Sequence, residues 1–296
     1  MSAPALDSRD YIVAFELESI ADCPADFQVS PELSGFEAGL FLPRDDPDWF
    51  GRSAYPPRVI LLRDGYLHVV AHPEAAEPGW EFPLEHLVAV EAGHMLLKGW
   101  FRFTGCAADK TLLFNMRGYR AVSRFMRRFR QQWLGPPEAS SAADLAAVAE
   151  PELGIKFGYA LSAELDRSEA VRSLLFQPPR ESRGRRWFLT RVQRTPGDLV
   201  ALTSRRLLWI SDRYRASYAP YGTAASSIRL DRVVGTGVTS TAHECALEIR
   251  TALGVTWTIP LAGDRRSETE AFASGLSSIG PAPENGPCCR SAAERI

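Results

Sequence analysis

The sequence predicts an α+β fold of two tandem units, each a bent antiparallel sheet or partial barrel closed by a C-terminal helix. Residues 84–90 and 230–236 repeat one pattern: a hydrophobe, an acid, an aliphatic pair and a β-branched residue occupy the same places. Each copy follows two β-rich runs and precedes further β-rich runs and an amphipathic helix. An internal repeat of this kind indicates the architecture before any motif is considered.

In the first unit, alternating apolar residues predict a strand at 11–17. Two β-rich runs flank Asp64-Gly65, a dipeptide typical of tight hairpin turns. The closing helix is predicted at 117–133, where apolar residues recur every three or four positions. The other predicted strands of this unit are 58–62, 66–71, 80–90, 95–103 and 110–115.

In the second unit, the same alternation predicts a strand at 155–161, and a short helix capped by Ser168 is expected at 168–176. Gly254 is expected at a hairpin turn. Further elements are predicted at 199–202, 207–211, 227–236, 245–250 and 255–261 (strands) and at 267–279 (helix). The predicted boundaries are 1–136 for the first unit, 137–152 for a linker, 153–280 for the second unit and 281–296 for a disordered tail.

The second unit also resembles a known superfold. The run from Thr203 to Arg206, followed by apolar residues, is similar to the "T-x-x-R-hydrophobe-hydrophobe" turn of bacterial pleckstrin-homology-like (PH-like, or GRAM-like) domains. Residues 228–233 resemble their next strand. The first unit departs from this pattern, with Asp64-Gly65-Tyr66 at the turn. The resemblance implies a bacterial platform for lipid head groups, peptides or other domains, and it does not choose among them.

Bulk composition narrows the class of protein. The chain has 296 residues, a formal charge of −2 and 45% hydrophobic residues, which is typical of soluble globular proteins and gives no overall field to attract nucleic acid. Five scattered cysteines without a CxxC spacing do not predict a disulfide framework or a zinc site. No signal peptide and no membrane-spanning helix are predicted. The expectation is a cytoplasmic protein, with attachment to the inner face of the membrane as an alternative.

Catalytic motifs are missing from the sequence. GxSxG, GxxxxGK[ST], GxGxxG and HExxH do not occur, so the prediction is a protein without a catalytic site, cofactor, metal or evident small-molecule substrate. His68 and His72 lie on one face of a strand, where a metal site is the alternative to a polar surface. A hydrolase using His68 or His72 with Glu91 is retained as the enzymatic alternative.

Arginine clusters supply the candidate binding residues. On the first closing helix they fall opposite the apolar stripe, and a second cluster lies in the other unit. Such faces suit carboxylate or phosphate groups, and the alternative is a merely solvated surface. The predicted function is therefore a binding or scaffold protein with a protein partner, or else a peripheral binder of anionic lipid. The candidate residues are Arg117, Arg120, Arg124, Arg127, Arg128, Arg205, Arg206 and Arg213.

Overall fold

A computed structural model describes most of the chain in two compact units, residues 1–87, 94–102 and 110–136, and residues 88–93, 103–109 and 137–296. The residues described are 7–8, 11–44, 55–95, 98–105, 109–135, 153–166, 169–186, 189–195, 197–212, 222–241, 244–252 and 254–278, with the backbone alone at 95, 180–186 and 189–195. The predicted linker (137–152) and tail (281–296) lie outside these residues.

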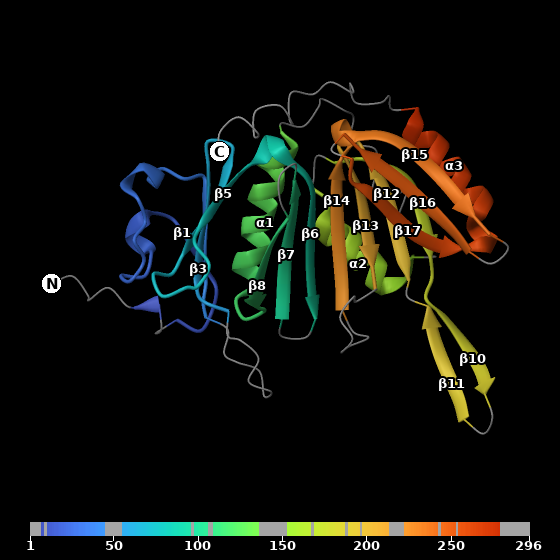
Figure 1. Ribbon diagram of the computed structural model, residues 1–296, viewed down its shortest axis with the longest axis horizontal. Helices are drawn as coiled ribbons and strands as arrows, with labels where there is room; N and C mark the ends of the chain where they lie inside the picture. The colour runs from blue at the N-terminus through green and yellow to red at the C-terminus, as the bar shows by residue number, and fades with distance from the viewer. Residues whose placement is uncertain are drawn as a thin grey trace. The chain divides into compact units, whose positions relative to one another are not determined.

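The fold is mixed α+β, and the strand pairs are antiparallel, as the sequence predicted. In the first unit, five strands pair in the order β1-β2-β3-β4-β5. In the second, the order is β14-β13-β12-β9, and β15-β16-β17 form a three-stranded sheet (Figure 1). Among the described strands, none of these sheets closes into a barrel.

The elements of the first part of the chain run from β1 to α1. They are β1 (Phe15–Leu17), η2 (Ile20–Asp22), η3 (Pro31–Leu33), β2 (Ala38–Leu42), β3 (Arg58–Arg63), β4 (Tyr66–Ala71), β5 (Trp80–Pro83), η4 (Leu84–His86), β6 (Leu87–Met95), β7 (Lys98–Gly105), β8 (Asp109–Asn115) and α1 (Tyr119–Leu134), where η denotes a short 3-10 helix. The β3–β4 turn has positive φ at Asp64 (49°) and Gly65 (77°), as the dipeptide predicted.

The elements of the second part run from α2 to α3. They are α2 (Gly154–Glu164), β9 (Val171–Gln177), β10 (Arg180–Arg186), β11 (Leu189–Thr195), β12 (Asp198–Thr203), β13 (Arg206–Ser211), β14 (Gly222–Arg229), η7 (Leu230–Arg232), β15 (Val233–Ser240), β16 (Glu244–Thr251), β17 (Thr256–Ala262), η8 (Gly263–Arg265) and α3 (Arg266–Ser277). Strands β16 and β17 form the predicted hairpin across Gly254, and α3 packs on β15 and β16 (Figure 1).

The order of elements repeats. A hairpin, one strand, a 3-10 helix, three strands and an α-helix follow one another in both parts: β3-β4, β5, η4, β6–β8 and α1, then β12-β13, β14, η7, β15–β17 and α3. The two copies of the leucine–acid motif form η4 and η7, each immediately before a long strand. The repeated local sequence therefore forms the same local structure twice.

Both faces of each hairpin sheet are buried, which explains why its strands are apolar at consecutive positions. On β3, Val59 and Leu61 pack under the N-terminal segment, in a cluster with Phe27 and Phe41. On β12, Leu199 and Ala201 pack with Phe157 and Leu161 of α2, whereas Val200 and Leu202 join the core that includes Phe272 of α3. An additional outer layer therefore covers each sheet on the side away from the closing-helix core.

Five element predictions were wrong. The predicted strands at 80–90 and 227–236 are each divided by a 3-10 helix, η4 and η7. The predicted strand at 155–161 is helix α2, because Phe157 and Leu161 are four residues apart and share a buried helical face. The predicted helix at 168–176 is largely strand β9, which pairs with β12. The predicted strand at 11–17 is regular only at Phe15–Leu17, where β1 pairs with β2.

Candidate functional site

The five arginines predicted on the first closing helix all lie on one solvent-exposed surface. Arg120, Arg124, Arg127 and Arg128 are exposed on α1, and Arg117 is exposed just before it. Because Arg120 and Arg128 are eight residues apart on α1, this surface extends for about 12 Å along the helix. We call these five residues the arginine face of α1.

The opposite side of α1 fixes the orientation of the arginine face. Phe125, Met126, Phe129 and Trp133 are buried at helical spacing, and α1 packs against β1 and β2. The Trp133 indole N–H also donates a hydrogen bond to the Leu87 carbonyl oxygen at 3.3 Å. Since one side is anchored by large apolar residues, the arginines remain directed to solvent.

The charge of the arginine face is mostly uncompensated. Helix α1 contains no acidic residue, and its first turn therefore lacks the acid that a helix N-terminus favours. Arg124 forms an ion pair with Glu16 of β1. Within the part of the chain that the structure describes, Arg120, Arg127 and Arg128 form no ion pair. The face thus presents several unpaired guanidinium groups to anything that approaches it.

The start of α1 adds apolar groups beside the arginines. Gly118 has φ of 83° and lies against the Val13–Ala14 backbone, whose Ala14 N–H donates to the Arg117 carbonyl oxygen at 3.2 Å. Ile12, Val13 and Tyr119 expose 65%, 43% and 45% of their surface. This end of the face therefore combines positive charge with exposed apolar side chains.

The arginines of the second predicted cluster do not share one exposed surface. Arg213 lies outside the described residues, and Arg205 is half-buried. Arg206 is fully buried and its guanidinium donates to Glu169 (Nε to Oε1 2.8 Å, Nη2 to Oε2 2.9 Å), to Ser227 Oγ at 2.8 Å and to the Glu164 carbonyl oxygen at 2.5 Å. No guanidinium nitrogen of Arg206 is left for an external partner.

Thr203 completes this buried network. Its hydroxyl oxygen lies 2.7 Å from Glu169 Oε1 and accepts the backbone N–H groups of Arg205 and Arg206, at 3.2 and 3.0 Å. Burial would raise the pKa of Glu169, but the charge of Arg206 and the hydrogen bonds lower it. The Thr203–Arg206 segment that resembles PH-like domains therefore holds the β12–β13 turn to the chain before β9.

The histidines that the sequence singled out are engaged elsewhere. His72 Nε2 lies 2.8 Å from Asp26 Oδ2, and its Nδ1 accepts the Glu74 N–H at 3.1 Å, so both ring nitrogens are bonded within the first unit. His68 Nδ1 lies 3.6 Å from Glu81 Oε2. Glu91, the predicted carboxylate partner, instead accepts a hydrogen bond from Ser226 at 3.2 Å.

The Asp26 carboxylate, which lies beside His72, takes part in several hydrogen bonds. Burial alone would raise its pKa, but hydrogen bonds from Ser8 and His72 lower it to about 2. The Ser8 backbone N–H donates to Asp26 Oδ1 at 2.9 Å, and the Ser8 hydroxyl donates to Oδ2. The carboxylate of Asp26 therefore links the N-terminal segment to the end of β4.

Among the residues that the structure describes, no three His, Cys, Asp or Glu side chains gather closely enough to hold a metal ion. The described helices include none that is long and apolar enough to cross a membrane. Comparison with protein-family models and with curated proteins finds no match.

Proposed function

We propose that the protein is a non-catalytic binding or scaffold module that docks an acidic segment of a protein partner on the arginine face of α1. One observation carries this proposal: four exposed arginines lie along a helix without a single acidic residue, and a fifth lies just before it, in a chain whose formal charge is −2. Charge of one sign, collected on one element of an otherwise balanced protein, suits recognition of the opposite charge.

The chemistry of the face favours carboxylates. A guanidinium group donates two parallel hydrogen bonds to one carboxylate, and three of the arginines lack an internal partner among the described residues. Glu16 already accepts a hydrogen bond from Arg124 Nε. A partner helix or strand bearing several acids over about 12 Å could pair with the remaining arginines.

We also propose that the protein consists of two PH-like units in tandem. In support, β2-β3-β4-β5 and β9-β12-β13-β14 pair in the same order, and each set leads to a 3-10 helix, three strands and a closing helix. An experimental structure tests this proposal directly, because the two halves must superpose element by element. Halves that fail to superpose would refute the duplication.

Anionic lipid is the second candidate ligand. Ile12, Val13 and Tyr119 are exposed near Arg117, and a surface that mixes apolar side chains with arginine suits the interface of an anionic membrane. The acidic protein partner remains the first proposal because the exposed apolar groups lie at one end of the face, whereas the arginines occupy its whole length.

Fluorescence anisotropy with a labelled poly-glutamate peptide tests the proposal, and sedimentation with phosphatidylglycerol vesicles forms the second arm. We expect peptide binding that weakens as salt rises from roughly 50 to 300 mM. The triple variant Arg120→Glu, Arg127→Glu, Arg128→Glu should bind at least about tenfold more weakly. The matched control reverses Arg265 and Arg266, which start the other closing helix and pair with Glu268 and Glu270.

Three outcomes are informative. Equal binding by the triple variant and the wild type would refute the arginine face as the docking surface. Binding to vesicles without binding to the peptide would favour the lipid candidate instead. Capture of a host protein by the wild type, lost in the triple variant and kept in the control, would identify the partner.

A further inference from the structure

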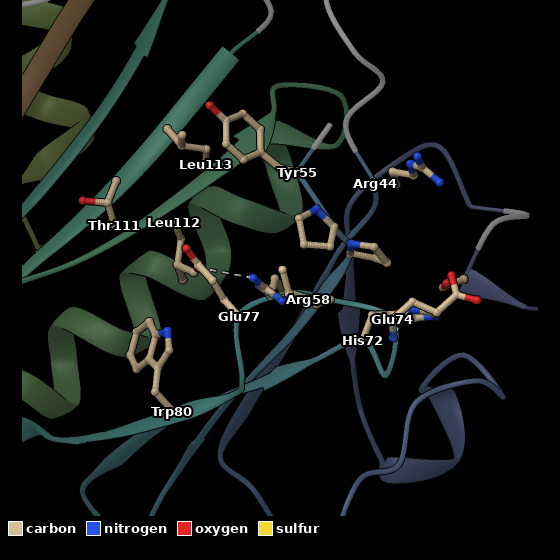
Figure 2. A pocket seen from close by; sticks show the side chains of 15 residues that line it. Arg44, Tyr55, Arg58, His72, Glu74, Glu77, Trp80, Thr111, Leu112 and Leu113 are labelled. Carbon is tan, nitrogen blue, oxygen red and sulfur yellow. Dashed lines mark hydrogen bonds and ion pairs between the residues drawn. The ribbon is translucent and has the colours of Figure 1, made fainter. Parts of the chain in front are cut away.

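A cavity of about 600 Å³ lies within the first unit, away from the arginine face residues. It is bounded by the start of β3, the connection from β4 to β5, and β8, and Figure 2 shows the side chains around it. Its volume is in the range of small-molecule sites, roughly 300–1,000 Å³. Its lining includes Tyr55, Arg58, Glu74, Glu77, Trp80 and Leu112.

Arg58 is the central polar group of this cavity. Its side chain is only 12% exposed, and its Nη1 is buried without a hydrogen-bond partner among the described residues. Its Nη2 lies 3.7 Å from Glu77 Oε2, the contact drawn as a dashed line in Figure 2. The Glu77 side chain is 86% exposed, so this pairing is long and competes with water.

A buried guanidinium with an unused donor favours an anion. Burial lowers the pKa of Arg58, and the charge of Glu77 opposes this only in part. Leaving a buried N–H donor unpaired costs on the order of 1–3 kcal/mol, more for a charged group. A carboxylate whose two oxygens accept from Nη1 and Nη2 would remove this cost and form the two-point contact that arginine prefers.

The lining residues other than Arg58 indicate the shape and charge of the rest of the ligand. Tyr55 and Trp80 are aromatic, and prolines, alanines and leucines, including Leu112, make up the rest of the apolar lining. The polar lining also includes Ser8, Arg44, His72 and Thr111. Lys110 Nζ lies 5.9 Å from the centre of the Trp80 ring, which adds positive charge beside that wall. Glu74 and Glu77 also line the cavity and would repel a ligand with several negative charges. The walls thus suit a flat apolar body with one negative charge.

We propose that this cavity binds a small aromatic monocarboxylate, whose carboxylate accepts hydrogen bonds from Arg58 in place of Glu77 while its ring packs on the aromatic and apolar wall. This site is separate from the proposed docking surface, and either proposal can fail without the other. No sequence motif indicated a small-molecule site, because its residues come from five separate stretches of the chain.

Isothermal titration calorimetry with 2-naphthoate tests the proposal, with 2-naphthamide and inorganic phosphate as comparison ligands. We expect 2-naphthoate to bind with a dissociation constant in the micromolar to millimolar range. The uncharged amide should bind about ten- to hundredfold more weakly, because it lacks the charged contact with Arg58. Phosphate should bind more weakly still, since it has no apolar body.

Variants then locate the site. Arg58→Gln should weaken 2-naphthoate binding by about ten- to hundredfold, whereas Arg58→Lys should retain part of it. Arg63→Gln is the matched control, because Arg63 ends the same strand, pairs with Asp64 and does not line the cavity. If Arg58→Gln fails to fold, Arg58→Lys and the comparison of acid with amide on the native protein still decide the question.

Three results would overturn the proposal. The first is no binding of 2-naphthoate at millimolar concentration. The second is equal binding of acid and amide, which would mean that Arg58 does not select charge. The third is tighter binding of phosphate than of 2-naphthoate, which would indicate an inorganic-anion site without recognition of the aromatic body.

Discussion

The two closing helices occupy the same place in the order of elements, yet they differ in charge. Helix α1 has arginines and no acid, and its arginine face is exposed and mostly unpaired. Helix α3 pairs its own charges: Arg265 lies 2.6 Å from Glu268, and Arg266 lies 2.8 Å from Glu270. Spacings of three and four residues bring such partners together on one helix. The comparison indicates that closing a sheet requires only the apolar stripe, so the charge of α1 is available for binding.

The β3–β4 and β12–β13 hairpins also differ, in the side chain that begins their second strand. The first residue of β13, Arg206, is buried and bound to Glu169, whereas the first residue of β4, Tyr66, is 38% exposed. The residue after β4, His72, is paired with Asp26, and the residue after β13, Asp212, is paired with Lys156 of α2. In each unit, a side-chain contact therefore joins the outer layer to the end of the hairpin, although the residues are unrelated.

The largest expected effect on stability comes from breaking the buried ion pair between Arg206 and Glu169. Glu169→Gln should lower the free energy of unfolding by about 3–5 kcal/mol, because it leaves the Arg206 charge buried without a counter-charge. Tyr66→Ala, at the first residue of β4, should cost less than about 1 kcal/mol. Denaturant titration measures both changes. A Glu169→Gln variant as stable as Tyr66→Ala would contradict the structural role assigned to the network.

Next in size is the start of the closing helix. Gly118→Ala should cost about 2 kcal/mol or more, because φ is 83° there and a Cβ atom would lie 2.3 Å from the Ala14 carbonyl oxygen. Arg265→Ala, at the N-cap of α3, should cost only about 0.5 kcal/mol through loss of its pair with Glu268. Thermal unfolding of the two variants checks the difference, and equal melting temperatures would refute it.

Acid should weaken the outer layer of the first unit. Because the pKa of Asp26 is lowered from 3.8 to about 2 in the folded protein, its ionised form contributes stability above about 3.8 that is lost as the pH falls towards 2. After allowance for solvent screening, the free energy of unfolding should fall by on the order of 1 kcal/mol. Asp26→Asn should flatten this part of the stability–pH profile. Parallel profiles for wild type and variant would show that Asp26 does not titrate as described.

The smallest effect is expected from exposed charges at the helix starts. Arg120→Glu should stabilise α1 by about 0.5 kcal/mol, since it places an acid in the first turn and removes repulsion among arginines. Glu268→Arg in the first turn of α3 should destabilise by a similar amount. Denaturant midpoints at low salt measure both. Loss of peptide binding together with gained stability in Arg120→Glu would show that α1 retains its charge for function rather than for folding.

Local patterns predicted much of the fold and the exposed arginines. The hairpins and the two closing helices follow from spacing and turn residues within a short window, whereas the 3-10 helices η4 and η7 were predicted as strand. The error at 155–161 has a local cause as well. Ile155, Phe157, Tyr159 and Leu161 alternate like a strand, but the first and third are 95% and 75% exposed while the other two are buried on one side of α2. Periods of two and of four cannot be separated in so short a run.

By itself, the sequence determined the repeated order of elements and the single-sign charge of α1, because both depend on residues within one or two turns or strands of each other. Only the tertiary structure decided that Arg206 is buried, that the charge of α1 is mostly unpaired, that each hairpin sheet has a second covering layer, and that Arg58 lines a cavity. The physical reason is that burial and ion pairing depend on contacts between distant segments. Glu169 reaches Arg206, and Glu77 reaches Arg58, only after the chain has folded.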